Sequence, residues 1–99
     1  MAEPDETTRV EHHADRHRFE ILVGDEVAGY AEYRPGPESR DFDHTVTLPQ
    51  FRGRGLAAVL VRDALDDTRA AGLSVVPSCS YVRHFVDTNP EYRDLVAGA

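Results

Sequence analysis

The sequence predicts a mixed α/β (α+β) domain on the basis of three features. Apolar and polar residues alternate as in strands over 18–23, 27–34 and 41–48. A glycine-punctuated connection at 49–55 then leads into a segment of helical period at about 54–71. A short apolar run at 73–77 follows, and this strand–helix–strand order brings the strands 41–48 and 73–77 parallel in one sheet.

The N-terminal part predicts antiparallel strands. Residues 1–8 are polar and predict a mobile tail ahead of a single domain over 9–97. Residues 10–13 are expected to begin a strand. Gly24-Asp25-Glu26 predicts a tight turn that joins 18–23 and 27–34 into a hairpin. Two prolines in 35–39 predict a loop.

In the strand 41–48, plain alternation assigns the side chains to two faces. His44 is therefore expected on the apolar face, shortly before the glycine connection. The other members of that face are Phe42, Val46 and Leu48, and the opposite face carries Asp43, Thr45 and Thr47.

Two helices are predicted in the second half of the chain. The longer one has apolar rows at i, i+4 spacing, ends at Gly72, and is expected to place Asp66 and Asp67 on its solvated side. A short C-terminal helix at 81–88 follows the last strand, and a closing turn spans 90–95. Tyr81 and Tyr92 lie on these last two elements, where we expect their rings to pack and their hydroxyls to remain as polar tips; the alternative is a hydrogen bond to substrate or cofactor.

Composition excludes several classes of function. The 18 acidic and 11 basic residues give a formal net charge of -7, which argues against a nucleic-acid binder and favours a cationic partner. No apolar run approaches the roughly 20 residues of a membrane span, and no secretory signal is predicted. The single cysteine, Cys79, excludes an intrachain disulfide and a multi-cysteine zinc site. We expect a cytoplasmic protein with no membrane partner, and a monomer is favoured although the oligomeric state stays open.

A metal site is not expected. His13 and His17 are four residues apart, which is a ligand spacing on a helix. The segment around them does not have a helical pattern, however, and no acidic partner pattern accompanies it.

The connection Gln50-Phe51-Arg52-Gly53-Arg54-Gly55 favours anion binding. Its glycines let the backbone turn sharply and expose N–H groups, and a helix start adds unpaired donors and about half a positive charge. Arg52 and Arg54 at this end oppose the helix dipole, a conflict that a bound phosphate removes. The alternative is that Gly53 and Gly55 only make a tight turn. The stretch fits neither the P-loop nor the dinucleotide-binding pattern.

The same connection resembles the Gln/Arg-x-x-Gly-x-Gly/Ala motif of the GCN5-related N-acetyltransferases (GNAT). The likeness to a compact YjdJ-like, NATD1-type branch of that family covers about residues 10–97. That branch usually reads His-Thr-Glu-Val, whereas this chain has Val46 in place of Glu, so a carboxylate that could act as a base is missing there. The branch also usually has His before Pro-Glu-Tyr, where this chain has Asn89. The segments that carry the likeness are Phe19-Glu20, Gly29-Tyr30-Ala31-Glu32-Tyr33, His44-Thr45, Arg52-Gly53-Arg54-Gly55-Leu56-Ala57, Ala64-Leu65-Asp66, Val76-Pro77-x-Cys79-x-Tyr81-Val82 and Pro90-Glu91-Tyr92-x-Asp94-Leu95.

The resemblance implies a compact GNAT-like fold and acetyl transfer from acetyl-coenzyme A (acetyl-CoA) to an amine, either a small amine, a polyamine or a protein lysine. It implies that the connection binds the pyrophosphate and that the diverging strands 41–48 and 73–77 admit the pantetheine arm. The alternative is a CoA-binding or protein-interaction module with little catalysis. The residues assigned to the cofactor are Gln50, Phe51, Arg52, Gly53, Arg54, Gly55, Leu56, Val46 and Tyr81.

Cys79 and His44 are the catalytic candidates. Thiols at helix N-termini have lowered pKa values, so Cys79 is a candidate to accept the acetyl group or relay a proton, and the alternative is a pocket-lining apolar side chain. Histidine titrates near neutral pH, which suits His44 as the base for an ammonium substrate, and the alternative is a hydrogen-bonded cleft histidine. A bound water is a further proton acceptor. Glu32 and Tyr33 are weaker cleft candidates.

Overall fold

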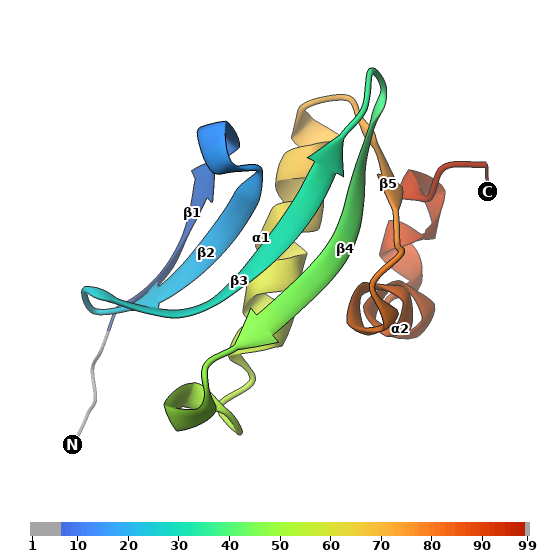
Figure 1. Ribbon diagram of the computed structural model, residues 1–99. Helices are drawn as coiled ribbons and strands as arrows, with labels where there is room; N and C mark the ends of the chain where they lie inside the picture. The colour runs from blue at the N-terminus through green and yellow to red at the C-terminus, as the bar shows by residue number, and fades with distance from the viewer. Residues whose placement is uncertain (1–6, 99) are drawn as a thin grey trace.

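The computed structural model describes residues 7–98, and it consists of a five-stranded sheet packed against one long helix (Figure 1). The strands, in spatial as well as chain order, are β1 (Thr8–His13), β2 (Arg18–Val23), β3 (Glu26–Pro35), β4 (Ser39–Thr47) and β5 (Ser74–Val76). The helices are α1 (Leu56–Ala70) and α2 (Ser80–Thr88), with 3-10 turns η1 (Ala14–Arg16), η2 (Pro49–Phe51) and η3 (Pro90–Leu95). The predicted mixed α/β class is confirmed.

The strand pairing agrees with the expected directions. β1 to β4 are antiparallel neighbours, and β5 pairs parallel with β4. Three strands extend beyond their predicted bounds. Thr8, assigned to the tail, pairs with Val23, and Pro35, assigned to a loop, ends β3 opposite Arg40. β4 begins at Ser39, two residues before its predicted start. Residues 1–6, the greater part of the predicted tail, lie outside the described residues.

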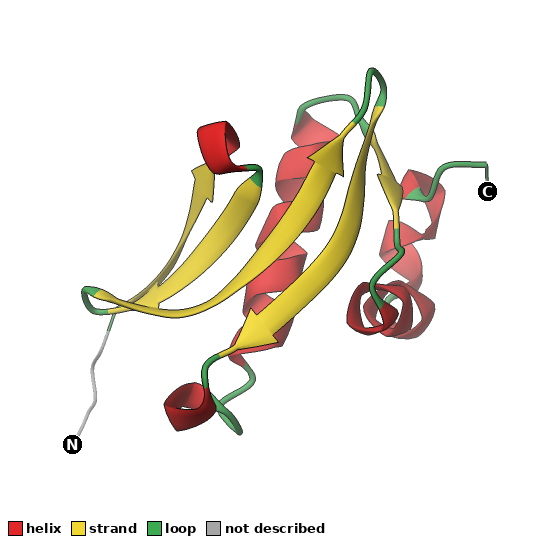
Figure 2. Cartoon of the chain, viewed as in Figure 1, coloured by secondary structure: helices red, strands yellow, loops and turns green. Residues whose placement is uncertain are grey.

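Helix α1 covers one face of the sheet, as Figure 2 shows. It begins at Leu56 and not at Arg54, because Gly55 adopts φ 73, a left-handed conformation that ends the turn before the helix. Within residues 7–98, no helix lies over the opposite face of β2 and β3, which we call the open face (Figures 1 and 2). No helix in the same range is both long and apolar enough to cross a membrane. The buried core between sheet and α1 includes Phe19, Ile21, Ala31, Tyr33, Phe42, Leu60, Val61, Ala64 and Leu65.

The predicted faces of β4 are wrong beyond Phe42. The register changes from Tyr33↔Phe42 to Glu32↔His44, which leaves Asp43 as an extra residue in a β-bulge. A one-residue insertion moves every later side chain to the other face. His44 and Val46 are consequently on the open face, and they do not share a face with Phe42. Thr45 and Thr47 are instead on the α1 side.

β4 and β5 separate soon after they begin. Their last paired residues are Asp41 and Val76, and the N–H of Cys79 then donates to the Phe42 carbonyl at 2.8 Å. Beyond Phe42, β4 has no strand partner on this side among the described residues. The result is an unpaired β4 edge over 43–47 that lies between the start of α1 and the start of α2.

Asp66 is exposed and Asp67 partly exposed, as predicted, but both also make contacts that the sequence did not indicate. The Tyr92 hydroxyl donates to Asp66 Oδ1 at 2.7 Å, and Arg40 Nη1 donates to Asp67 Oδ2 at 2.8 Å. Asp67 Oδ2 also lies 3.6 Å from His12 Nδ1. These aspartates tie α1 to the C-terminal turn and to the sheet.

Candidate active site

The β4–α1 connection has a backbone that requires its glycines. Gly53 and Gly55 adopt φ 84 and φ 73, which residues with a Cβ rarely adopt. No atom lies within 4 Å of a Cβ built at either position, so conformation and not crowding selects glycine. Gly55 is the N-cap of α1 and supplies no side-chain cap. The first N–H groups of α1 therefore lack a side-chain acceptor among the described residues, as an anion-binding helix start requires.

A pocket of about 120 Å³ lies at this helix start. Its walls combine the end of β4, the connection, the first turn of α1 and one residue of α2. The predicted cofactor residues among them are Phe51, Arg52, Gly53, Gly55, Leu56 and Tyr81, whereas Gln50, Arg54 and Val46 are not lining residues. The role of all these residues in binding a cofactor stays a prediction. The lining residues that the sequence did not indicate are Thr47, Ala57 and Ala58.

The start of α1 concentrates positive charge in an acidic chain. Arg52 Nε donates to the Thr47 carbonyl at 3.3 Å, and the Arg54 guanidinium lies 5.4 Å from the centre of the Phe51 ring. The first turn of α1 contains no acidic residue. Two guanidinium groups therefore add to the positive end of the helix dipole, and a bound anion relieves their mutual repulsion.

Cys79 is half-buried and is the N-cap residue of α2. Its Sγ lies 3.4 Å from Thr45 Oγ1 on β4. Burial raises the pKa of the Cys79 thiol, but hydrogen bonds from the Thr45 hydroxyl and from the amides of Val82, Tyr81 and Thr45 outweigh this effect, so the pKa lies below its ordinary value. A lowered pKa increases the fraction of thiolate, the nucleophilic form, relative to that of an ordinary cysteine.

His44 is exposed on the open face. Its ring centre lies 6.3 Å from that of Tyr30, and its direct cross-strand partner is Glu32 on β3. Val46 follows on the same face opposite Tyr30, so Glu32 is a carboxylate neighbouring the position where the resemblance led us to expect one. Tyr33, the other weak cleft candidate, is buried in the core and bonds to His12 Nε2 at 2.7 Å.

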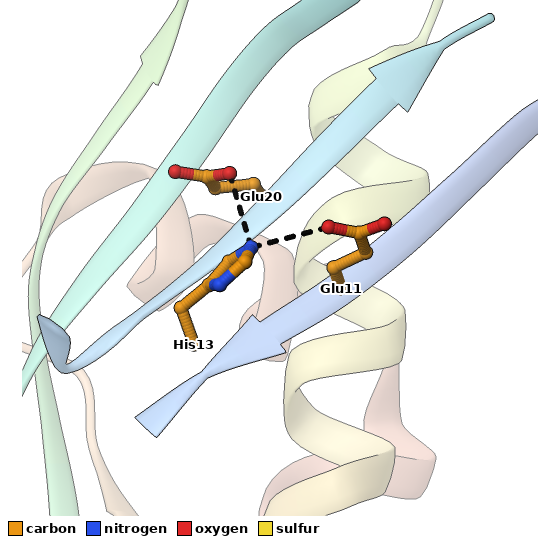
Figure 3. A group of neighbouring side chains, drawn as sticks. All are labelled: Glu11, His13 and Glu20. Atoms are coloured by element: carbon orange, nitrogen blue, oxygen red, sulfur yellow. Dashed lines mark hydrogen bonds and ion pairs between the residues drawn. The ribbon is translucent and has the colours of Figure 1, made fainter. Parts of the chain in front are cut away.

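A second group of titratable side chains lies on β1 and β2, away from the pocket. Figure 3 shows His13 between Glu11 and Glu20, with its Nε2 3.2 Å from one carboxylate oxygen of each. Three ligand atoms this close together can in principle hold a metal ion. The predicted pair was a different one, His13 and His17, and the structure does not place His17 in this group.

The second oxygens of both carboxylates face arginines. Arg9 Nε lies 3.0 Å from Glu11 Oε2. Arg18 Nε and Arg16 Nη2 lie 3.6 Å and 3.7 Å from Glu20 Oε2. Because these guanidinium groups already balance the carboxylates and repel a further cation, we interpret the group as an ion-pair network that joins β1 to β2.

The fold and the glycine connection define a known class of protein. Residues 18–95 match the family model of the GCN5-related N-acetyl-transferases. The chain therefore belongs to the GCN5-related N-acetyltransferase family, as its sequence resemblance implied.

Within that family the chain is similar to NATD1 proteins. It is 32% identical over 91 residues to Protein NATD1 of Xenopus tropicalis, an alignment that covers 89% of this chain and 83% of that protein. It is 33% identical over 85 residues to Protein NATD1 of Mus musculus, covering 83% of this chain and 76% of that protein. The chain is thus a NATD1-type domain.

Solved structures share the fold. A GCN5-like protein from Staphylococcus aureus, determined by NMR, superposes with a TM-score of 0.70 at 21% identity and covers 92% of this chain and 89% of that one. A GCN5-related N-acetyltransferase from Kribbella flavida superposes with a TM-score of 0.58 at 23% identity, covering 74% of this chain and 21% of that chain. The compact GNAT-like fold expected from the sequence is confirmed.

Proposed function

We propose that this chain is an N-acetyltransferase that transfers the acetyl group of acetyl-CoA to an amine. The observation that carries the proposal is the uncapped start of α1 with its two glycines and Arg52, placed directly beside the unpaired edge of β4. The first feature suits a pyrophosphate, and the second offers free backbone groups to the amide-containing arm of the same molecule. Membership of the family supports this assignment.

The chain's own residues fit acetyl-CoA at both ends. The glycine conformations of the connection leave open space where a Cβ would otherwise project, so a phosphate can approach the backbone closely. Acetyl-CoA supplies the acetyl group as a thioester. Backbone N–H groups of the β4 edge are the donors we assign to the thioester carbonyl, a role equivalent to that of an oxyanion hole.

The amine must lose a proton before it attacks, because an ammonium group has no free electron pair. In direct transfer, His44 or a water accepts this proton. In a two-step route, the Cys79 thiolate attacks the thioester carbonyl, an S–C bond forms, and the thiolate of CoA leaves. The amine then attacks the acetylated Cys79, expels its thiolate and gives its proton to His44 or water. The identity of the amine stays open between a small amine and a protein lysine.

Two observations favour a second candidate, a CoA-binding or protein-interaction module with little catalysis. Val46 occupies the open-face position where a carboxylate base was expected. Among the described residues no helix covers the open face, so no extra layer for substrate recognition lies there. Cytoplasmic location and a monomeric state also stay predictions.

The deciding experiment measures CoA release from acetyl-CoA in the presence of polyamines, small amines and lysine-containing peptides. Acetyl transfer to at least one of them, identified by mass spectrometry of the product, supports the enzyme. Binding of acetyl-CoA with no acetylated product across the whole panel favours the binding module. Absence of binding contradicts both.

A further inference from the structure

Cys79 occupies a position in α2 that normally carries a different residue type. An N-cap side chain usually supplies an oxygen that accepts from the second or third N–H of the helix, which here belong to Tyr81 and Val82. Within the described residues these two amides lower the pKa of Cys79, although neither meets the geometry of a full capping hydrogen bond to its sulfur. A neutral thiol is a weak acceptor, but a thiolate is a strong one, so this position favours the ionised form of the side chain.

Thr45 contacts the same sulfur from the opposite side of the site. The Cys79 N–H is fixed on the Phe42 carbonyl at 2.8 Å, and Sγ then lies 3.4 Å from Thr45 Oγ1. The bulge at Asp43 is what directs Thr45 toward Cys79, since an unbroken strand would present His44 on that side. The sulfur is therefore held between the β4 edge and the first turn of α2.

We propose that Thr45 is a positioning residue that stabilises the Cys79 sulfur as a thiolate and directs it along the unpaired β4 edge. The use of this thiolate in acetyl transfer rests on the proposed function, but its ionisation does not and is measurable without acetyl-CoA. The lowered pKa of Cys79, in which the Thr45 hydroxyl is the largest favourable contribution, agrees with the geometry. On the two elements that hold the sulfur, the titratable or charged side chains closest along the chain to Thr45 and Cys79 are Asp43 and His44 on β4 and Tyr81 and Arg83 on α2. None of these side chains is a cause of the shift, which comes from burial and hydrogen bonds.

The test is the rate of alkylation of Cys79 by iodoacetamide as a function of pH. Cys79 is the single cysteine of the chain, so the mass change reports on it alone. Thr45→Val keeps the shape and removes the hydroxyl, and we expect it to move the midpoint of the profile upward and to lower the rate near neutral pH about tenfold. Thr45→Ser is expected to restore the wild-type profile. Thr88→Val, the same change at the far end of α2, is the matched control and is expected to leave the profile unchanged.

Two results overturn the proposal: a Thr45→Val profile equal to that of the wild type, or a Thr45→Ser profile equal to that of Thr45→Val. Thr45→Ala is the second variant if Thr45→Val does not fold, and it is expected to show the same upward movement. With acetyl-CoA and an accepted amine, Thr45→Val should lower kcat and leave KM for acetyl-CoA unchanged. If no amine is acetylated by the wild type, the proposed function fails while the alkylation profiles still decide the role of Thr45.

Discussion

His44 and Cys79 lie on opposite faces of β4. The bulge at Asp43 places His44 opposite Glu32 on the open face, whereas Cys79 contacts Thr45 on the α1 side, with Sγ and Oγ1 3.4 Å apart. The two candidate proton acceptors therefore approach the same strand edge from two directions. If the chain acts as proposed, we expect an amine that enters over the open face to meet His44, and an acetyl group carried along the edge to come within reach of Cys79.

This separation predicts that His44 acts on the amine and not on the binding of acetyl-CoA. We expect His44→Gln to lower kcat by about 10²-fold, as is typical for the loss of a general base, with little change in KM for acetyl-CoA. Steady-state rates over a range of pH test this. Tyr30→Phe, a change on the same face that removes no base, is the control. An unchanged kcat in His44→Gln would assign the proton to water.

Substitution of Cys79 distinguishes the two routes of transfer. If the two-step route operates, we expect Cys79→Ala to lose nearly all activity, and mass spectrometry after mixing wild type with acetyl-CoA alone to show an acetyl group on Cys79. Cys79→Ser keeps the size and the position at the start of α2 and is the matched variant for packing. Full activity in Cys79→Ala would exclude the covalent route and leave direct transfer.

The close approach of β3 to β4 at Gly29 is expected to control the geometry of the site. A Cβ at Gly29 would lie 2.5 Å from the Val46 carbonyl oxygen and 3.3 Å from the Thr47 Cα, so β4 has to move to admit it. We expect Gly29→Ala to lower the free energy of unfolding by about 1–3 kcal/mol and to weaken the binding of acetyl-CoA. Urea unfolding and calorimetry measure the two effects.

Gly36→Ala is the matched control for that substitution. The one tight contact of a Cβ there is with Ser39 Oγ, at 3.0 Å, and that side chain can rotate away, while the Ser39 backbone oxygen and nitrogen lie at ordinary distances of 3.5 Å and 4.0 Å. Its expected effect on unfolding is within about 0.5 kcal/mol, as for most surface changes. A Gly29→Ala protein as stable as the wild type would contradict the backbone contact.

Charge reversal at the start of α1 should weaken binding of acetyl-CoA. We expect Arg52→Glu and Arg54→Glu each to raise the Kd about tenfold at low salt, because each change removes a cation beside the predicted pyrophosphate position. The difference from wild type should shrink as salt rises. Arg93→Glu makes the same change of charge in η3, where Arg93 bonds to the Asp87 carbonyl, and serves as the control. Equal affinities for all three variants would argue against a pyrophosphate at this helix start.

Acidification should destabilise the protein through His12. Burial lowers the pKa of His12, Arg40 and His13 add to the shift, and Asp67 opposes it. Because the folded-state pKa lies below the value of about 6.5 in an unfolded chain, the unfolded state binds more protons between these two values. The stabilisation is thus fully present above about pH 6.5 and falls as the pH drops through that value.

Urea unfolding at about pH 7.5 and about pH 5.5 tests the linkage. We expect His12→Phe, which keeps a ring against Phe19 and loses the hydrogen bond to Tyr33, to lose less stability on acidification than the wild type does. His84→Gln, on the exposed side of α2, controls for the removal of a histidine outside this network. Equal losses in His12→Phe and wild type would assign the pH dependence to other groups.

The order and direction of the elements could be predicted because they depend on local patterns. Alternation marks the strands, and the positive-φ glycines Gly24, Gly55 and Gly72 mark where elements end. The bulge at Asp43 could not be predicted, because nothing in 41–48 breaks the alternation, and the extra residue appears only in the pairing with β3.

The partners within the site depend on contacts that are distant in sequence. Thr45 meets Cys79 across 34 residues, and Thr47 enters the pocket only because the bulge turns it toward α1. Ala57 and Ala58 line the pocket from the first turn of α1. In the sequence, alanines at a pocket wall cannot be told apart from alanines packed in a core. The glycine connection could be predicted as an anion-binding segment, because its residues are contiguous in sequence and the backbone conformation that they require is local.

Calorimetric titration of wild-type protein with acetyl-CoA and with acetyl-pantetheine tests the central claim, that the β4–α1 connection anchors the pyrophosphate of acetyl-CoA. Acetyl-pantetheine carries the same thioester arm without the pyrophosphate. The structure predicts one site for acetyl-CoA and an affinity for acetyl-pantetheine lower by at least about tenfold. No detectable binding of acetyl-CoA, or equal affinities for the two compounds, would contradict the account.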